Sequence, residues 1–141
     1  MKLTLRAVII GLLGISLVAL VIVRGCRSPR DKGQILYELH CESCHGKNGE
    51  GFYSYPPIAG ADYLETHKNE VACMIYYGME NPIVVNGEAY HGRMLGNTQL
   101  TEVQIANLAN YIFSFPGNSG ATFNQADIQN QLENCSGSVV K

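Results

Sequence analysis

Apolar positions divide the chain into one continuous run near the N-terminus and several shorter stretches with amphipathic spacing. The run at 7–23 contains no charged residue. As a helix it would be about 26 Å long at 1.5 Å per residue, close to the roughly 30 Å hydrocarbon core of a bilayer. Lys2 and Arg6 precede it. This pattern is typical of a signal peptide or membrane anchor, which we place at 1–25, and argues against the alternative of a buried core helix.

The pattern beyond this run predicts a mostly helical domain at 34–135. Helices are predicted at 34–40, 69–78 and 100–115, and a short last helix is predicted at 124–135. Thr101 and Gln104 form a capping box at the start of the third helix. A polar linker with helix breakers at 26–33 precedes the domain, and a flexible tail at 136–141 follows it.

Two segments between the predicted helices have other patterns. The segment 46–60 holds four glycines and two adjacent prolines, which predicts a loop. Asn86 and Gly87 stand between β-forming residues, which predicts a hairpin at 83–90.

Charge is distributed unevenly along the chain. Residues 1–32 hold six basic residues and one acidic residue, a net charge of +5, whereas 33–141 hold four basic and eleven acidic residues, a net charge of −7. An acidic domain argues against a nucleic-acid partner and fits a head that meets basic or neutral protein surfaces. Four basic residues directly follow the apolar run: Arg24, Arg27, Arg30 and Lys32. The positive-inside rule places such residues in the cytoplasm, which conflicts with export of the domain.

The clearest chemical motif is C-x-x-C-H, formed by Cys41, Cys44 and His45. This is the signature of covalent haem attachment. Two thiols one helical turn apart can each add to a haem vinyl group, and the adjacent imidazole then supplies the proximal iron ligand. The motif also fits a thiol redox site or half of a structural zinc site. The chain has no second C-x-x-C and no βαβ pattern, so we predict one covalent haem c.

The sixth iron ligand has several candidates. They are Met74, Met79, Met94, His40, His67 and His91. Met94 is preferred because it lies in a glycine-flanked loop ahead of the capped helix, as expected of a ligand supplied from a distant loop. Met74 falls inside a predicted helix, where core packing is the simpler role, and Met79 follows that helix at once. His91 is the main competitor, with a solvated loop histidine as its alternative.

Three cysteines remain outside the motif. Cys73 and Cys135 are candidates for a disulfide, with a buried apolar Cys73 and a free Cys135 as the alternative. Disulfides and haem attachment to thiols both suit an exported, oxidising compartment. Cys26 follows the apolar run in a segment that resembles a bacterial lipobox. Lipidation of Cys26 and an uncleaved helical anchor stay open as modes of membrane attachment.

Four segments in order carry a family resemblance: "CESCHGKNGEG" (41–51), "PPIAGADYL" (56–64), "NPIVVNGEAYHGRM" (81–94) and "LTEVQIANLANYIFSFPGN" (100–118). With them the chain, from about 33 to 132, resembles class I c-type cytochromes. It is particularly similar to the small haem domains found free or fused to periplasmic oxidoreductases.

The resemblance implies a fold of helices packed around a covalently bound haem. It implies thioether bonds from Cys41 and Cys44 and axial iron ligation by His45 and Met94. It also implies that the carbonyl of Pro57 accepts the imidazole N–H of His45, a contact that fixes the orientation of the ligand.

One position departs from the family pattern. A proline usually follows the ligand methionine, and Leu95 stands there in this chain. Because a stiff residue is lost, we expect a weaker bond from Met94 to iron or a more mobile loop.

Iron closed by histidine and methionine suits electron transfer. We therefore expect a membrane-tethered periplasmic monohaem cytochrome c, not an enzyme, that carries single electrons between redox proteins. Docking is expected at the haem edge near Cys41 and Cys44, against a basic or nearly apolar partner surface. The alternative is a gas sensor or peroxide-using enzyme with a labile or open sixth site, served by His91 and Arg93. A subunit of a larger oxidoreductase complex is a third interpretation.

Overall fold

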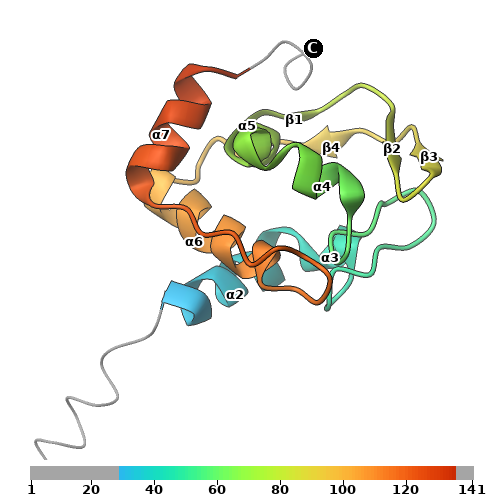
Figure 1. The fold of residues 1–141 in the computed structure, drawn as a ribbon, viewed down its shortest axis with the longest axis horizontal. Helices are drawn as coiled ribbons and strands as arrows, with labels where there is room; N and C mark the ends of the chain where they lie inside the picture. Colours follow the sequence, from blue (N-terminus) through green and yellow to red (C-terminus); the bar gives the residue numbers. More distant parts are fainter. Residues whose placement is uncertain (1–28, 136–141) are drawn as a thin grey trace, which may run out of the picture.

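The computed structural model describes residues 29–135 of the chain (Figure 1). The predicted anchor at 1–25, the lipidation candidate Cys26 and the predicted tail at 136–141 lie outside these residues. Within 29–135, no helix is both long and apolar enough to cross a membrane.

Helices make up most of the described chain. In order they are α2 (Pro29–His40), α3 (Glu42–His45), α4 (Asp62–Thr66), the 3-10 turn η1 (Lys68–Glu70), α5 (Val71–Tyr77), α6 (Glu102–Phe113) and α7 (Gln125–Glu133). Two short antiparallel pairs accompany them: β1 (Gly78–Met79) with β4 (Met94–Leu95), and β2 (Ile83–Val85) with β3 (Glu88–Tyr90). The predicted mostly helical fold with a small hairpin is therefore confirmed, and the β1–β4 pair is an addition to it.

The first described helix corrects the predicted linker over 29–33, and the rest of that linker, 26–28, lies outside the described residues. Helix α2 begins at Pro29, because proline is well tolerated in the first turn of a helix, where its missing N–H has no intrahelical partner. Gly33 lies inside α2 and does not break it. A Cβ at Gly33 would overlap the carbonyl oxygen of Asn107 and lie 2.7 Å from Cβ of Tyr111. Glycine is needed at this position because the backbones of α2 and α6 approach closely there.

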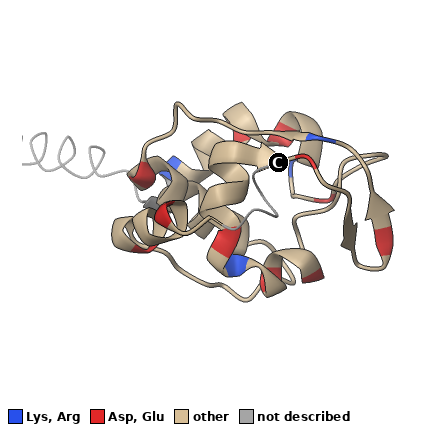
Figure 2. Ribbon diagram, turned by 90° about the horizontal axis from the view of Figure 1, so that it is seen from above, with Lys and Arg blue, Asp and Glu red and all other residues tan. Residues whose placement is uncertain are grey.

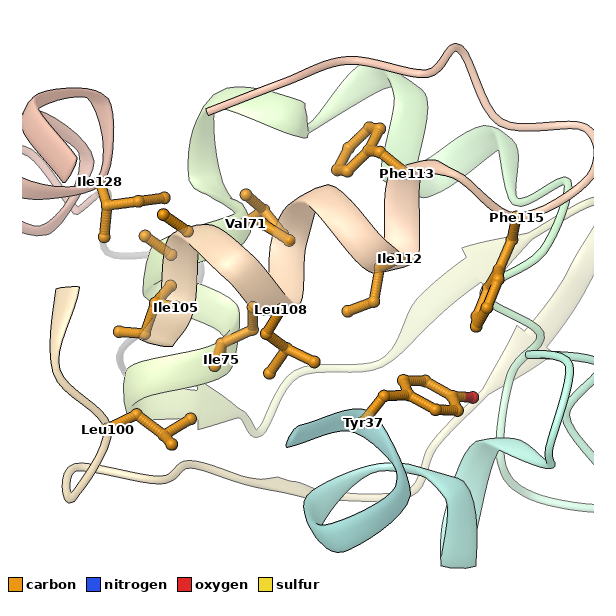
Figure 3. Close-up of a cluster of buried hydrophobic side chains, with 13 residues drawn as sticks. Tyr37, Val71, Ile75, Leu100, Ile105, Leu108, Ile112, Phe113, Phe115 and Ile128 are labelled. Atoms are coloured by element: carbon orange, nitrogen blue, oxygen red, sulfur yellow. The ribbon is translucent and has the colours of Figure 1, made fainter. Parts of the chain in front are cut away.

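The core lies around α6 (Figure 3). Ile105, Leu108, Ile112 and Phe113 project from it and are almost fully buried. Tyr37 of α2 is completely buried and packs edge-on against Phe115 and tilted against Tyr111. Val71 and Ile75 of α5 and Ile128 of α7 complete the cluster. The apolar stripe predicted at 100–115 is therefore the centre of the domain.

The helix ends follow local sequence signals. Thr101 and Gln104 make the predicted capping box at the start of α6. Asn124 and Asp127 make a second one at the start of α7, within the helix predicted at 124–135. The helix predicted at 69–78 begins as η1 and continues as α5, and Gly78 ends it with a φ of 80°.

The β2–β3 hairpin turns at the predicted residues. Asn86 and Gly87 have φ values of 53° and 84°, the left-handed conformations that a tight two-residue hairpin requires. The hairpin is tied to α4, because Asn86 accepts a hydrogen bond from the backbone N–H of Asp62 and donates its own N–H to the Asp62 carboxylate. In Figure 1 this hairpin and α7 lie at opposite ends of the domain.

Candidate functional site

The C-x-x-C-H motif forms one helical turn directly after α2. The backbone N–H of Cys41 donates to the carbonyl of Tyr37, which continues the helical path beyond His40. The N–H of His45 donates to the carbonyl of Cys41 at 2.9 Å. Positions i, i+3 and i+4 of a helical turn lie on one face. Cys41, Cys44 and His45 therefore present two thiols and an imidazole to the same side of the chain.

His45 is buried, and its ring is fixed by one backbone group. Nδ1 of His45 lies 2.9 Å from the carbonyl oxygen of Pro56. A carbonyl only accepts, so Nδ1 carries the proton and donates it, which leaves a lone pair on Nε2. Burial lowers the pKa of His45 below its usual value, opposed by the smaller effect of the Pro56 hydrogen bond. The imidazole is thus held neutral, with one nitrogen prepared to bind a metal.

This contact corrects the predicted role of Pro57. The acceptor is the carbonyl of Pro56, one residue earlier. The loop at this point is set by Gly49, whose carbonyl accepts hydrogen bonds from the N–H groups of Ile58 and Ala59. The two adjacent prolines offer two equivalent carbonyls, and only the path of the loop determines which one accepts from His45.

The two motif cysteines are half-buried free thiols beside His45. Burial, and secondarily the neighbouring Cys44, raises the pKa of Cys41 to about 12. A thiolate is therefore disfavoured at Cys41, whereas a thioether sulfur has no charge to bury. The environment of Cys41 therefore fits a sulfur atom that ends as a neutral thioether.

A cavity of about 360 Å³ opens beside the motif. Its lining includes Cys41, Cys44, His45, Met79 and Met94. A smaller apolar cavity of about 80 Å³ continues towards α5 and α6, and His45, Met79 and Met94 line that one too. This combination of apolar walls, a neutral imidazole and a thioether suits a large apolar group with a metal at its centre. The residues present fit a haem.

Met94 is held in place by strand pairing. It stands opposite Met79, and Leu95 stands opposite Gly78, in the antiparallel β1–β4 pair. The backbone N–H of Asn97 then donates to the carbonyl of Ile75 at 2.9 Å. The segment after Met94, where Leu95 replaces the usual proline, is thus joined to α5.

The other sixth-ligand candidates occupy different environments. Met74 is buried on α5 and lines only the smaller of the two cavities. His40 is exposed, with Nδ1 lying 3.3 Å from the Asn97 amide, although it does line the larger cavity. His67 stacks on Tyr63 with ring centroids 4.0 Å apart. His91 is exposed and lines neither cavity.

The role of Tyr37 in the site was missed from sequence, and that of Met79 was ranked low. Met79 was considered as a sixth ligand and set aside because it directly follows a helix, yet it lines both cavities. Its register opposite Met94 depends on a strand pair too short to leave a periodic signal. Tyr37, four residues before the motif, anchors it by donating its hydroxyl to the carbonyl of Gly46 at 2.6 Å.

Cys73 and Cys135 are joined by a disulfide across 62 positions of sequence, with their Cα atoms 5.7 Å apart. This is the pairing considered from the sequence. The disulfide belongs to a small buried cluster with Met74 and Met79, against which Met94 packs. It therefore supports the methionine side of the cavity and links α5 to the end of α7.

Basic side chains are sparse near the cavity. Between residues 33 and 135 they are Lys47, Lys68 and Arg93, while Asp and Glu are spread over several helices and the hairpin (Figure 2). Arg93, which lines the larger cavity, pairs with Glu80 at 3.0 Å on the surface. The charge of Arg93 at the opening is therefore balanced by Glu80, and no Asp or Glu is among the described residues that line this cavity.

Comparison with known proteins assigns the family. The cytochrome c family model matches residues 31–115. A cytochrome c-552 of Thermus thermophilus is 31% identical over 102 residues, which cover 69% of this chain and 68% of that protein. The fructose dehydrogenase cytochrome subunit of Gluconobacter japonicus is 32% identical over 96 residues, which cover 64% of this chain but only 20% of the subunit. The chain belongs to the cytochrome c family, whose members carry covalently bound haem c.

Proposed function

We propose that this protein is a membrane-tethered, periplasmic monohaem cytochrome c that carries single electrons between redox proteins. The observation that supports it best is that His45 and Met94 line the same pair of cavities, beside two half-buried thiols. Cys41 and Cys44 are assigned the thioether bonds, and His45 and Met94 the two axial positions. When bound, haem c supplies the one-electron redox centre.

The residues around the site then have defined tasks. Pro56 fixes the ring of His45 through Nδ1, so that Nε2 would be the nitrogen that binds the iron. Apolar side chains such as Ile83, Val85 and Ile112 exclude water from the inner cavity. The thioether of Met94 closes the remaining iron position, and a histidine–methionine pair favours a high reduction potential and electron transfer.

The gas sensor or peroxide-using enzyme is less well supported. Peroxide cleavage would need acid–base groups at the distal side of the site, and His91 is exposed outside both cavities. Arg93 is engaged with Glu80 at the surface. The β1–β4 pairing also restrains Met94, which argues against a permanently open sixth position.

The partner is proposed to dock over the opening beside Cys41 and Cys44. Exposed apolar side chains lie on elements next to this opening, including Leu39 and Leu95, which are 69% and 75% exposed. Because the described head is acidic, a partner with a basic or nearly apolar surface is the best match. One relative is a cytochrome subunit of fructose dehydrogenase, which suggests an oxidoreductase as one class of partner.

Membrane attachment and export rest on sequence. The uncharged run at 7–23 behind Lys2 and Arg6 supports an anchor or signal segment, and Cys26 supports lipidation as the other mode. Haem attachment to thiols and the Cys73–Cys135 disulfide both suit an oxidising compartment.

The function is tested on the full chain, expressed in a bacterium with haem-attachment machinery. A low-spin oxidised spectrum with the weak long-wavelength band of methionine sulfur on ferric haem is expected. A high-spin spectrum would favour the open-site alternative, and a low-spin spectrum without that band would indicate a second nitrogen ligand. Cell fractionation should find the haem protein in the membrane, accessible from the periplasmic side. Co-purification would distinguish a free carrier from a subunit of a complex.

A further inference from the structure

Met79 and Met94 are register partners in the β1–β4 pair. Residues directly opposite each other in an antiparallel pair project to the same face, with Cβ atoms about 4.5–5.5 Å apart. Two flexible thioether side chains therefore start from neighbouring points on the distal side of the site.

Both methionines reach the same space. Met79 is only 7% exposed, and Met94 is half-buried. Each lines the larger cavity beside Cys41 and Cys44, and each also lines the smaller cavity next to it. Met74, the third methionine of this cluster, lies on α5 and lines the smaller cavity but not the larger one. Burial is common to Met74 and Met79, but of these two only Met79 lines both cavities, as His45 and Met94 do.

Two glycines keep the pair in register. A Cβ on Gly78 would lie 2.5 Å from the backbone N of Gly96 and would overlap the carbonyl oxygen of Met94. A Cβ on Gly96 would lie 2.5 Å from the carbonyl oxygen of Tyr76. The two backbones are therefore closer than side chains at these positions would allow. This close approach fixes Met79 beside Met94 in a pair of only two residues per strand.

We propose that Met79 is a second distal ligand, able to bind the haem iron whenever Met94 leaves it. This rests on the proposed function, in which Met94 is the resident ligand. In the exchange the bond from Met94 sulfur to iron breaks and one from Met79 sulfur forms. Both donors are neutral thioethers, so no proton or electron moves, and a soft sulfur donor is kept on the iron. The exchange keeps the site closed to small molecules although the usual proline after Met94 is replaced by Leu95.

The first test uses the full-length haem protein with Met94→Leu, which removes the sulfur while nearly preserving volume. The long-wavelength thioether band of the oxidised form should persist in Met94→Leu and disappear in Met94→Leu/Met79→Leu. The matched control Met94→Leu/Met74→Leu should keep the band. Identical spectra without the band in Met94→Leu and in Met94→Leu/Met79→Leu would overturn the proposal. A wild-type protein without the band would instead refute the proposed ligand set.

A second test measures imidazole binding to the oxidised Met94→Leu protein, in which imidazole must compete with Met79 on this proposal. Met94→Leu/Met79→Leu should therefore bind imidazole several-fold more tightly than Met94→Leu. Met94→Leu/Met74→Leu should bind it as Met94→Leu does. An unchanged or lower affinity in Met94→Leu/Met79→Leu would overturn the proposal.

Discussion

The hydroxyl of Tyr37 donates a hydrogen bond of 2.6 Å to the carbonyl of Gly46, the residue that follows His45. Tyr37 is completely buried, and burial raises the pKa of its hydroxyl, so the proton needed for donation is retained. The bond joins the C-terminal part of α2 to the end of the haem-attachment turn. The same side chain thus belongs both to the core and to the support of His45.

Tyr37→Phe should remove this bond and keep the ring packing. A hydrogen bond of this kind contributes about 1 kcal/mol, and the Gly46 carbonyl keeps a weaker donor in the N–H of Gly49 at 3.3 Å. We expect the free energy of unfolding of the haem protein to fall by about that amount, measured by denaturant titration. Tyr53→Phe is the control, because Tyr53 is 97% exposed. Equal losses in both variants would contradict the role of the buried bond.

Gly33→Ala should destabilise the protein although Gly33 lies in a helix. In an exposed helix interior, alanine is favoured over glycine by about 1 kcal/mol. Here the new Cβ would overlap the carbonyl oxygen of Asn107 on α6, so the two helices must separate. Overpacking of this kind costs about 1–3 kcal/mol. A denaturant midpoint below that of wild type is expected. A higher midpoint would show that α2 and α6 can move apart at little cost in free energy. Gln34→Ala, at an exposed neighbouring position, should have little effect.

The double variant Cys73→Ala/Cys135→Ala should lose about 2–4 kcal/mol of stability, because the disulfide restricts the unfolded chain. Hydrogen exchange should increase first in α7, whose end is attached through Cys135. Reducing agent should lower the stability of wild type and leave the double variant unchanged. Equal unfolding midpoints of the two proteins without reductant would contradict a stabilising disulfide.

The sequence predicts most of this fold because its signals are local. The capping box of Thr101 and Gln104, the Asn86-Gly87 turn and the C-x-x-C-H motif each act within a few residues, and each is found where the pattern places it. Gly33 and Met79 were misread because their roles depend on distant backbone. The need for glycine at position 33 follows from the close approach of α6, and the place of Met79 in the site follows from its pairing with the strand that holds Met94.

The choice between Pro56 and Pro57 has a similar origin. The two residues differ in no intrinsic property that would direct one carbonyl to His45. The hydrogen bonds from Ile58 and Ala59 to the carbonyl of Gly49 set the path of this loop. A resemblance carried over residue by residue can therefore be displaced by one position wherever a residue type is repeated.

The tip of the loop between Phe52 and Tyr55 supplies a second position at which glycine should be more stable than alanine, here because of the backbone conformation. Phe52 and Tyr55 exchange backbone hydrogen bonds of 3.1 and 3.0 Å, so Tyr53 and Ser54 form a two-residue turn. Tyr53 has a φ of 50°, a conformation that costs a residue with a Cβ about 1–2 kcal/mol relative to glycine. Tyr53→Gly should therefore be more stable than Tyr53→Ala, by roughly 0.5–1 kcal/mol after the greater unfolded-state entropy of glycine is included. Comparing these two variants cancels the lost contact between the Phe52 and Tyr53 rings, because neither retains it. Denaturant titration of both haem proteins measures the difference, and a more stable Tyr53→Ala would mean that the turn relaxes out of the left-handed conformation once the tyrosine is gone.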